Sequence, residues 1–416
     1  MTVRAAWLYD ADVDVSEPER ILISIPNWVG DVVMATAALR AVRRRFPTAG
    51  IIHLMRPYVA DVLAGTAFCD DAIFWPAHGG GSSGGGGAGE TPTPPIVRRD
   101  AGETPTPPDL RQSAGVLDLV RRLRRERFDL AILLTNSFRS ALVTRLAGVR
   151  RRVGYARDGR GWLLTERLSA PRKDGRFVPI PALDYYNALA RHVGCEDPGD
   201  KLELATLPAD EAAIEPRLAC GHRRDACATP QPRAAVPHGG PLVVLNPGAN
   251  YGSAKCWPPE YYAQLADALV ERFGARVVAS LGPKERETAD RLAAAAWRPI
   301  DIFVDPPLGL GPLKALVRRC DLLITNDTGP RHFAAAFGVP VVTIFGSSDP
   351  AWTETRFAKE RMVMLKLDCQ PCMERTCPLK HHDCMRRLLP AMVLEKAEEL
   401  LAAWSGCATA VKQPCS

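Results

Sequence analysis

The sequence predicts an α/β protein with two domains, each organised around a parallel β-sheet. Short apolar segments typical of buried strands alternate with helical segments in both halves of the chain. Polar or glycine-bearing loops follow several of these strands, and such loops open onto helix N-termini that can bind anionic ligands. The chain has 416 residues, which is long enough for two domains with separate cores.

The composition is that of a globular protein with a small excess of positive charge. Hydrophobic residues make up 46% of the chain and charged residues 24%, and the net charge is +6. This charge is far below that of a nucleic-acid-binding arm, so we expect no nucleic-acid partner; it suits an anionic substrate or an acidic membrane surface. We find no apolar run of 18 residues and no signal peptide, and therefore expect a cytoplasmic protein with reduced thiols.

The first domain is expected to span 21–214, after an acidic N-terminal extension at 1–20. It opens with a strand at Ile21–Ile25, a tight loop, and a helix at Asp31–Phe46. Asp31 lies at the start of this helix, directly after a glycine and close to the end of the strand. It could simply cap the helix, or its carboxylate could accept a proton from an incoming hydroxyl group.

The same alternation continues through the rest of the first domain. Its further strands are predicted at Ile51–Leu54, Ile73–Trp75, Leu130–Leu134 and Arg150–Gly154, and its further helices at Tyr58–Ala64, Ser113–Arg127, within Asn136–Ala147, and at Asp184–Val193. Residues 79–110 interrupt the pattern with a Gly/Ser-rich and then Pro-rich segment in which AGETPTPP occurs twice. Because few apolar residues there could offset the entropy of ordering, we expect a disordered insertion in a loop.

The second domain is expected at 241–390, after an irregular linker at 215–240 and before a C-terminal helix and tail at 391–416. A strand at Leu242–Leu245 leads into a loop with two glycines, whose backbone amides can approach phosphates closely. In this loop Ser253 adds a hydroxyl donor and Lys255 a positive charge. The loop lacks the ending of a Walker A motif, and a lysine that is merely solvated is an equally good interpretation.

The segment Cys320–Pro350 is the most informative part of the second domain. It predicts a strand at Leu322–Thr325, a polar turn, a helix at Arg331–Phe337 and a strand at Val339–Phe345. In the turn, Asp327 could bond sugar hydroxyls, and the amides at the helix start could face a pyrophosphate. The alternative is an ordinary βαβ unit whose polar loop only caps the helix.

Several motifs in a fixed order give the chain a specific resemblance. They are PNWVGD (26–31), NSFRSAL (136–142), RRVGY (151–155) with GRGWLLT (159–165), NPGANYGSAKCWP (246–258), TNDTGPRHFAAAFGVPVVTIFG (325–346) and DCQPC…RTCPLKHHDCM (368–385). With them the chain resembles the ADP-heptose:lipopolysaccharide heptosyltransferases of glycosyltransferase family 9, most closely the heptosyltransferase II group. The insertion and residues 195–240 depart from the family pattern, and both lie outside these motifs.

The resemblance implies a GT-B architecture, in which two Rossmann-like domains enclose an active site in the cleft between them. The N-terminal domain would bind the acceptor and the C-terminal domain the nucleotide sugar. Asp31 would be the general base, with Asn27, Trp28 and Gly30 on the acceptor side. The residues implied on the donor side are Asn250, Tyr251, Ser253, Lys255, Glu285, Asp327, Thr328, Gly329 and His332.

The resemblance also implies the reaction. Heptose would pass from ADP-heptose to an inner-core heptose of lipopolysaccharide in one inverting displacement, at the cytoplasmic face of the inner membrane, with peripheral membrane contact. No D-x-D motif follows a predicted strand, so we expect that catalysis requires no cofactor and no metal bridging the phosphates. Two alternatives remain: another GT-B nucleotide-sugar transferase with a different donor, or a metal- or redox-responsive binding protein built on a cysteine cluster.

That cluster lies near the C-terminus, with the spacing C-x2-C-x4-C-x6-C. Together with His381 and His382 it provides enough ligands for a structural zinc site or an iron–sulfur cluster. Reduced thiols packed in a loop near the acceptor are the alternative. The four cysteines are Cys369, Cys372, Cys377 and Cys384.

Overall fold

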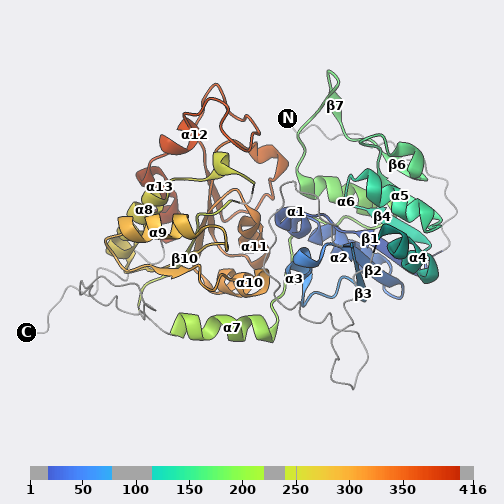
Figure 1. The fold of residues 1–416 in the computed structure, drawn as a ribbon, viewed down its shortest axis with the longest axis horizontal. Coiled ribbons are helices and arrows are strands. Elements are labelled where there is room, and N and C mark those ends of the chain that lie inside the picture. Colours follow the sequence, from blue (N-terminus) through green and yellow to red (C-terminus); the bar gives the residue numbers. More distant parts are fainter. Residues whose placement is uncertain (1–16, 77–114, 220–238, 250, 403–416) are drawn as a thin grey trace, which may run out of the picture.

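The computed structural model describes residues 17–76, 115–219, 239–249 and 251–402. Within these ranges the chain forms two six-stranded sheets, both wholly parallel, with helices packed around them (Figure 1). The strand orders are β3-β2-β1-β4-β5-β6 and β11-β10-β9-β12-β13-β14. Both orders are that of a doubly wound Rossmann sheet, in which ligands bind where the winding direction reverses. The reversal points are β1/β4 and β9/β12.

Five strands of the first sheet lie close to those expected, and the sixth, β6, was not predicted. The strands are β1 (Arg20–Ser24), β2 (Gly50–Met55), β3 (Asp71–Phe74), β4 (Leu130–Leu133), β5 (Arg151–Tyr155) and β6 (Glu166–Leu168). The helices of this domain are α1 (Val29–Met34), α2 (Thr36–Arg45), α3 (Ala60–Leu63), α4 (Val116–Glu126), α5 (Phe138–Leu146) and α6 (Ala182–His192), with short 3-10 turns η1 (Pro57–Val59) and η2 (Gly161–Leu163). A small antiparallel hairpin, β7 (Arg172–Lys173) and β8 (Arg176–Phe177), projects from the domain.

The single helix expected at Asp31–Phe46 is divided in two. Helix α1 begins at Val29, and Ala35 separates it from α2. The hydroxyl of Thr36 donates a hydrogen bond of 2.7 Å to the carbonyl oxygen of Val33. Such back-bonding to the preceding turn competes with the helical ladder and bends helices, which explains the break.

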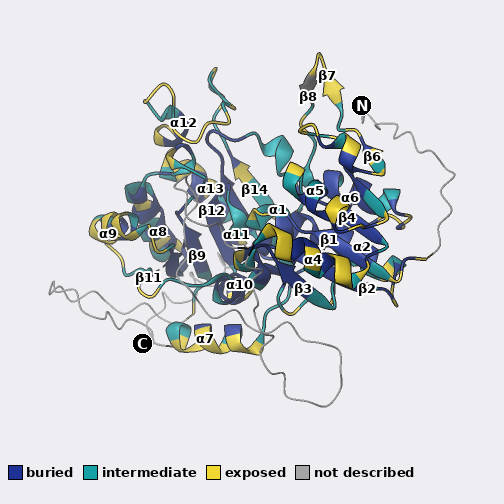
Figure 2. Cartoon of the chain, turned by 45° about the vertical axis from the view of Figure 1, so that its right-hand side comes forward, coloured by how far each residue is buried: buried dark blue, intermediate teal, exposed yellow. Residues whose placement is uncertain are grey.

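The second sheet carries the elements of the C-terminal half. Its strands are β9 (Leu242–Asn246), β10 (Arg276–Ser280), β11 (Asp301–Phe303), β12 (Leu322–Asn326), β13 (Val341–Ile344) and β14 (Glu360–Val363). Its helices are α8 (Pro259–Phe273), α9 (Arg286–Ala295), α10 (Leu310–Arg319), α11 (Gly329–Phe337), α12 (Asp383–Arg386) and α13 (Pro390–Leu400), with 3-10 turns η3 (Ser253–Lys255) and η4 (Pro350–Trp352). The central strands β9 and β12 are almost wholly buried, as continuous apolar runs in parallel sheets are (Figure 2).

Helix α7 (Pro208–Ala219) corrects the expected domain boundary. The irregular linker predicted at 215–240 begins inside this helix, and 220–238 lie outside the described residues. Although α7 precedes the second sheet in sequence, it packs on α10 beneath the second domain (Figure 1), and Glu211 pairs with Arg319 at 2.7 Å. The acidic extension up to residue 16, the insertion at 79–110 and the tail after 402 also lie outside the described residues.

The two domains meet through a largely apolar interface, and polar contacts around Lys314 and around Arg356 are among those that cross it in the described part of the chain. Buried apolar side chains form one cluster from the first sheet across to α10 and α11. Lys314 of α10 is fully buried and donates hydrogen bonds to the carbonyl oxygens of Val62, Ala64 and Ala205 at 3.2, 3.2 and 2.7 Å. Elsewhere, exposed Arg356 pairs with Asp184 at 2.5 Å and with Asp200 at 3.1 Å. None of the helices formed by the described residues has the length and apolar character needed to span a bilayer.

Candidate active site between the domains

Helices α1 of the first domain and α11 of the second lie against each other at the domain interface (Figure 1), and their first residues are in contact. They follow β1 and β12, the strands at the two reversal points. A Cβ atom at Gly30 would lie 2.7 Å from Cδ2 of His332, and one at Gly329 would lie 2.6 Å from Cγ1 of Val29. Both contacts are far shorter than van der Waals distance, so this approach of the two helices requires glycine at both positions.

Asp31 lies in the first turn of α1, directly after Gly30, and belongs to the N-terminal domain. Its pKa is raised to about 6, first by burial and then by the negative charge of Asp327, while Lys255 acts in the opposite direction. The structure therefore brings Asp31 within electrostatic range of two side chains from the other domain. A carboxylate with a pKa near 6 remains ionised at neutral pH and accepts a proton more readily than an ordinary aspartate.

Asp327 and Lys255, the two groups whose charges act on Asp31, form a buried ion pair. Nζ of Lys255 lies 2.6 Å from Oδ2 of Asp327, which also accepts a hydrogen bond of 2.7 Å from Ser348. The other oxygen of Asp327 lies 3.2 Å from Nη1 of Arg331. Burial alone would raise the pKa of Asp327, but Lys255 and Arg331 outweigh it and lower the pKa to about 2. Asp327 is thus ionised, and both of its oxygens already have partners in the protein.

The start of α11 adds backbone donors and a neutral histidine. Thr328 is the N-cap residue, and its hydroxyl contacts Thr325 and Asn246 rather than capping the helix. Unpaired amides at a helix N-terminus favour anions. His332 is buried, and burial followed by the charge of Arg331 lowers its pKa to about 3, so the imidazole is neutral. Its Nδ1 has no hydrogen-bond partner among the described residues.

The loop after β9 places Tyr251, Ser253 and Lys255 beside this helix start. Nζ of Lys255 lies 4.7 Å from the centre of the Tyr251 ring, a cation–π contact. Gly252 has φ +155°, and a Cβ there would lie 2.2 Å from the carbonyl oxygen of Arg375. The cysteine-bearing segment therefore packs directly on this loop. The remaining candidate of the loop, Asn250, lies outside the described residues.

Glu285 reaches the same loop from the end of β10. Its carboxylate accepts a hydrogen bond of 2.7 Å from the amide of Gly282. A Cβ at Gly248 would lie 2.1 Å from its Oε1, so Gly248 leaves the space that the carboxylate occupies. The structure thus joins Glu285 to the predicted donor loop, although the sequence match at this position is loose.

On the acceptor side, Asn27 and Trp28 lie in the exposed loop between β1 and α1. The backbone oxygen of Asn27 accepts a hydrogen bond from the hydroxyl of Tyr58. Trp28 is 52% exposed, which is unusual for a tryptophan next to a helix start.

The sequence did not indicate the buried residues that contact Asp327 or lie near Asp31. Arg331 and Ser348 are buried and bond Asp327 directly, and Glu360, whose side chain is 6% exposed, connects to Asp327 through Arg331. In the first domain, Tyr186 of α6 is also buried near Asp31, and burial followed by that carboxylate raises its pKa well above the usual value. Arg331 and Ser348 lie in the TNDTGPRHF motif or shortly after it, but nothing in the sequence indicates their partners.

The cysteine cluster does not form the predicted metal site. The pKa of Cys384 is raised to about 11, first by burial and then by the neighbouring thiols of Cys372, Cys377 and Cys369. The four thiols therefore share one region, and none of the four is in a disulfide. Yet in the part of the chain that the structure describes, no three His, Cys, Asp or Glu side chains gather closely enough to hold a metal ion. The structure leaves the proposed zinc or iron–sulfur site without support.

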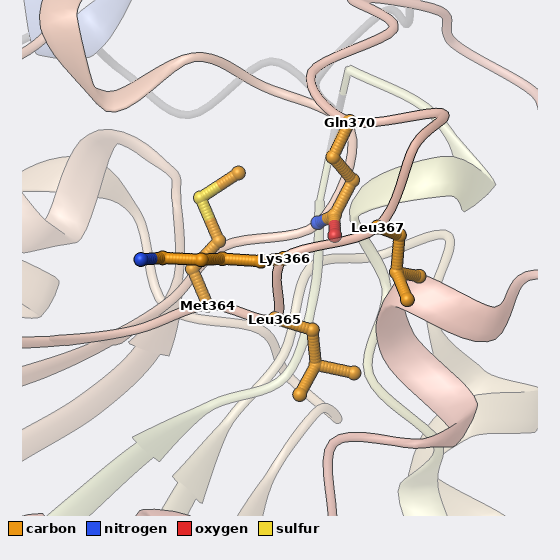
Figure 3. Close-up of a pocket in the computed structure, with 5 residues that line it drawn as sticks. All are labelled: Met364, Leu365, Lys366, Leu367 and Gln370. Atoms are coloured by element: carbon orange, nitrogen blue, oxygen red, sulfur yellow. The ribbon is translucent and has the colours of Figure 1, made fainter.

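A small pocket lies near the end of β14, apart from the residues discussed above (Figure 3). It has a volume of about 250 Å³ and is lined by Met364, Leu365, Lys366, Leu367 and Gln370. It contains none of the predicted site residues. The chemistry of the site therefore rests on the interdomain cluster around Asp31, Lys255 and Asp327.

Comparison with known proteins identifies the family. The profile of glycosyltransferase family 9 (heptosyltransferase) matches residues 116–383, more than half of the chain. The chain belongs to this family. The family 9 protein is 28% identical over 387 residues to lipopolysaccharide heptosyltransferase 2 of Escherichia coli K12, covering 92% of this chain and 98% of the relative. It is 38% identical over 175 residues to lipooligosaccharide heptosyltransferase 2 of Campylobacter jejuni serotype O:2, covering 39% of this chain and 52% of that relative.

Solved structures of similar proteins confirm the predicted fold class. The glycosyl transferase family 9 protein of Veillonella parvula superposes with a TM-score of 0.70 at 20% identity, over 92% of this chain and 97% of that one. The E. coli ADP-heptose LPS heptosyltransferase II superposes with a TM-score of 0.66 at 24% identity, over 92% and 99%. The family 9 chain is a glycosyltransferase with two Rossmann-like domains in the GT-B arrangement.

Proposed function

We propose that the protein transfers L-glycero-D-manno-heptose from ADP-heptose to a heptose of the lipopolysaccharide inner core, with inversion at the anomeric carbon. Family membership and the similarity to heptosyltransferases 2 favour this substrate class. One observation carries the mechanism: Asp31 of the N-terminal domain faces Lys255 and Asp327 of the C-terminal domain across a single interface.

In the proposed reaction, Asp31 accepts the proton of the acceptor hydroxyl as its oxygen attacks the anomeric carbon. The bond from that carbon to the diphosphate oxygen breaks, and ADP leaves with the bonding electron pair. The transition state resembles an oxocarbenium ion, so negative charge grows on the departing diphosphate. Lys255, which pairs with Asp327, and the amides at the start of α11 would stabilise that charge.

The donor would lie over the C-terminal sheet, with Tyr251 and Ser253 beside the phosphates, Glu285 at the ribose, and Asp327 and His332 near the heptose. Asp327 holds Nζ of Lys255 at 2.6 Å, which fixes the orientation of the lysine. We propose that none of these steps requires a bound cofactor, because the cationic groups of the chain supply the stabilisation.

We further propose that the protein meets its acceptor through peripheral contact with the cytoplasmic face of the inner membrane. The segments that follow β1, β2 and β4 carry the exposed aromatic side chains Trp28 (in a loop), Tyr58 (in η1) and Phe138 (at the start of α5). Aromatic rings of this kind settle at the headgroup level of a bilayer, and acidic headgroups attract a protein of net charge +6. Sedimentation with anionic vesicles, compared with neutral ones, tests this contact; Phe138→Ser should weaken it.

The direct test of the function is ADP release with ADP-heptose and a heptose-bearing inner-core acceptor. We expect turnover in the wild type and a loss of roughly 10²-fold or more in kcat for Asp31→Asn, the usual scale for a general base. A panel of other ADP- and UDP-sugars distinguishes a different donor. Absence of turnover with ADP-heptose, or an unaffected Asp31→Asn variant, would overturn the proposal.

A further inference from the structure

We infer that Glu360, at the start of β14, is a positioning residue for transfer and acts on Lys255 through Arg331 and Asp327. The inference rests on the proposed function and deepens it. Glu360 lies 105 positions beyond Lys255 in the sequence and belongs to none of the motifs that indicated the active site.

The first step is the pair between Glu360 and Arg331. Nε and Nη2 of the guanidinium lie 2.5 and 3.1 Å from the two carboxylate oxygens, a bidentate geometry. The hydroxyl of Thr343 donates a further bond of 2.6 Å to Glu360. The side chains of Arg331 and Glu360 are 1% and 6% exposed, so solvent hardly competes for either charge. The orientation of the guanidinium is therefore fixed from the side of β14.

The second step connects this pair to the active site. The remaining nitrogen of Arg331, Nη1, reaches Oδ1 of Asp327 at 3.2 Å and the hydroxyl of Thr353 at 2.8 Å. Because Glu360 occupies the other two nitrogens, Arg331 can give Asp327 only one hydrogen bond. Oδ2 of Asp327 is thereby left for Lys255 and Ser348.

The result is a chain of alternating charges, Glu360, Arg331, Asp327 and Lys255, that runs from β14 to the loop after β9; Asp31 of α1 lies within electrostatic range of its last two members. If Glu360 were neutral, the buried guanidinium would be balanced by one carboxylate instead of two. The carboxylate of Asp327 would then turn toward Arg331, and its hydrogen bond to Lys255 would weaken. Lys255 would move from the position in which it meets the departing diphosphate, and the field at Asp31 would become less negative.

The pKa of Asp31 depends on every charged or titratable group that faces it. From the second domain these are Asp327, Lys255, and the neutral His332 of α11. From α6 it is Tyr186, which remains protonated because its pKa is raised far above neutrality by burial. Helix α3 carries Asp61, whose carboxylate lies toward Lys314 and Asp210 instead. Asp31 is therefore the group expected to titrate near neutral pH in this set.

The test compares Glu360→Gln, Glu360→Asp and the control Glu399→Gln in ADP release across pH 5 to 9. Glu399 is exposed and pairs at 2.9 Å with Arg361, the residue that follows Glu360. For Glu360→Gln we expect kcat to fall roughly tenfold, the KM for ADP-heptose to change less than threefold, and the acidic limb of the kcat profile to move about half a pH unit lower. Glu360→Asp keeps the charge and should keep the wild-type limb, and Glu399→Gln should match the wild type.

A merely structural link between α11 and β14 would give a different result. It would lower the melting temperature of both Glu360 variants and leave the acidic limb where it is in the wild type. That result, or a wild-type kcat in a folded Glu360→Gln variant, would overturn the inference. Absence of ADP release in the wild type itself would instead refute the proposed function, so the two failures can be told apart.

Discussion

Replacing Asp31 with asparagine should make the protein less active and more stable at the same time. The pKa of Asp31 is raised from 3.8 to about 6 in the folded chain. An acid whose pKa is raised by folding destabilises the folded state wherever its carboxylate is ionised, and one pKa unit corresponds to about 1.36 kcal/mol. The carboxylate of Asp31 therefore costs about 3 kcal/mol of folding free energy above pH 6.

The sign of this effect determines its pH dependence. Below the unfolded pKa of 3.8 the carboxyl is protonated in both states, and the cost vanishes. Near pH 5 about half of it remains. Asp31→Asn removes the charge at every pH, so its gain in stability should be about 3 kcal/mol at pH 7.5, smaller at pH 5 and absent near pH 3.5.

Urea unfolding at these three pH values measures the gain, and ADP release measures the loss of activity. Asp118→Asn is the matched control, because Asp118 is also the third residue of its helix but is exposed and pairs with Arg121. The control removes the same charge from the same position relative to a helix dipole. If Asp31→Asn is no more stable than wild type at pH 7.5, burial does not penalise this carboxylate and the reasoning fails.

Three further predictions concern Lys255, Gly30 and Lys314. Lys255→Met should lower kcat/KM for ADP-heptose by roughly 10²-fold and move the acidic limb of the kcat profile to higher pH, because Lys255 lowers the pKa of Asp31; an unmoved limb would contradict the contact. Gly30→Ala should reduce kcat roughly tenfold or more with little change in melting temperature, because its Cβ would push against His332; full activity would show that α1 and α11 need not touch. Lys314→Met should lower the free energy of unfolding by about 1–2 kcal/mol, since three carbonyls lose their donor; the loss is reduced because burial lowers the pKa of Lys314 to about 8, so its charge itself opposes folding. Urea unfolding at pH 7 measures this, and an unchanged midpoint would contradict it.

Most of the sheet strands could be predicted from the sequence, because a strand buried on both faces is a short apolar run. Leu322–Asn326 and Leu242–Asn246 are of this kind. Their parallel order also explains why the loops carrying Lys255 and Asp327 meet, since the carboxyl ends of neighbouring strands lie at one edge. The family resemblance added Asp31 from the other domain. The contact between the two domains could not be read from periodicity.

What the sequence did not indicate depends on contacts between distant residues. Helix α7 contains Pro216 and only two large apolar residues, Ile214 and Leu218, and pairs such as Glu211 with Arg319 help to hold it. Likewise, Glu360 looks like an ordinary surface residue at a strand start until Arg331 is placed beside it. Cysteine spacing was misleading for a related reason: it counts ligands along the chain and says nothing about whether their side chains converge.

The polar contacts of Lys314 and those of Arg356 across the domain interface differ in how strongly salt weakens them. Lys314 is buried and bonds to neutral carbonyls, whereas the pairs of Arg356 with Asp184 and Asp200 are exposed. The Debye length falls from about 10 Å at 0.1 M to about 3 Å at 1 M, so molar salt weakens exposed ion pairs at contact distance, whereas buried groups are screened much less. Raising the ionic strength should therefore break the ion pairs of Arg356 with Asp184 and Asp200 first, while the contact between α10 and α3 remains. The cleft would then open as a rotation about the Lys314 side rather than as a uniform separation of the two sheets.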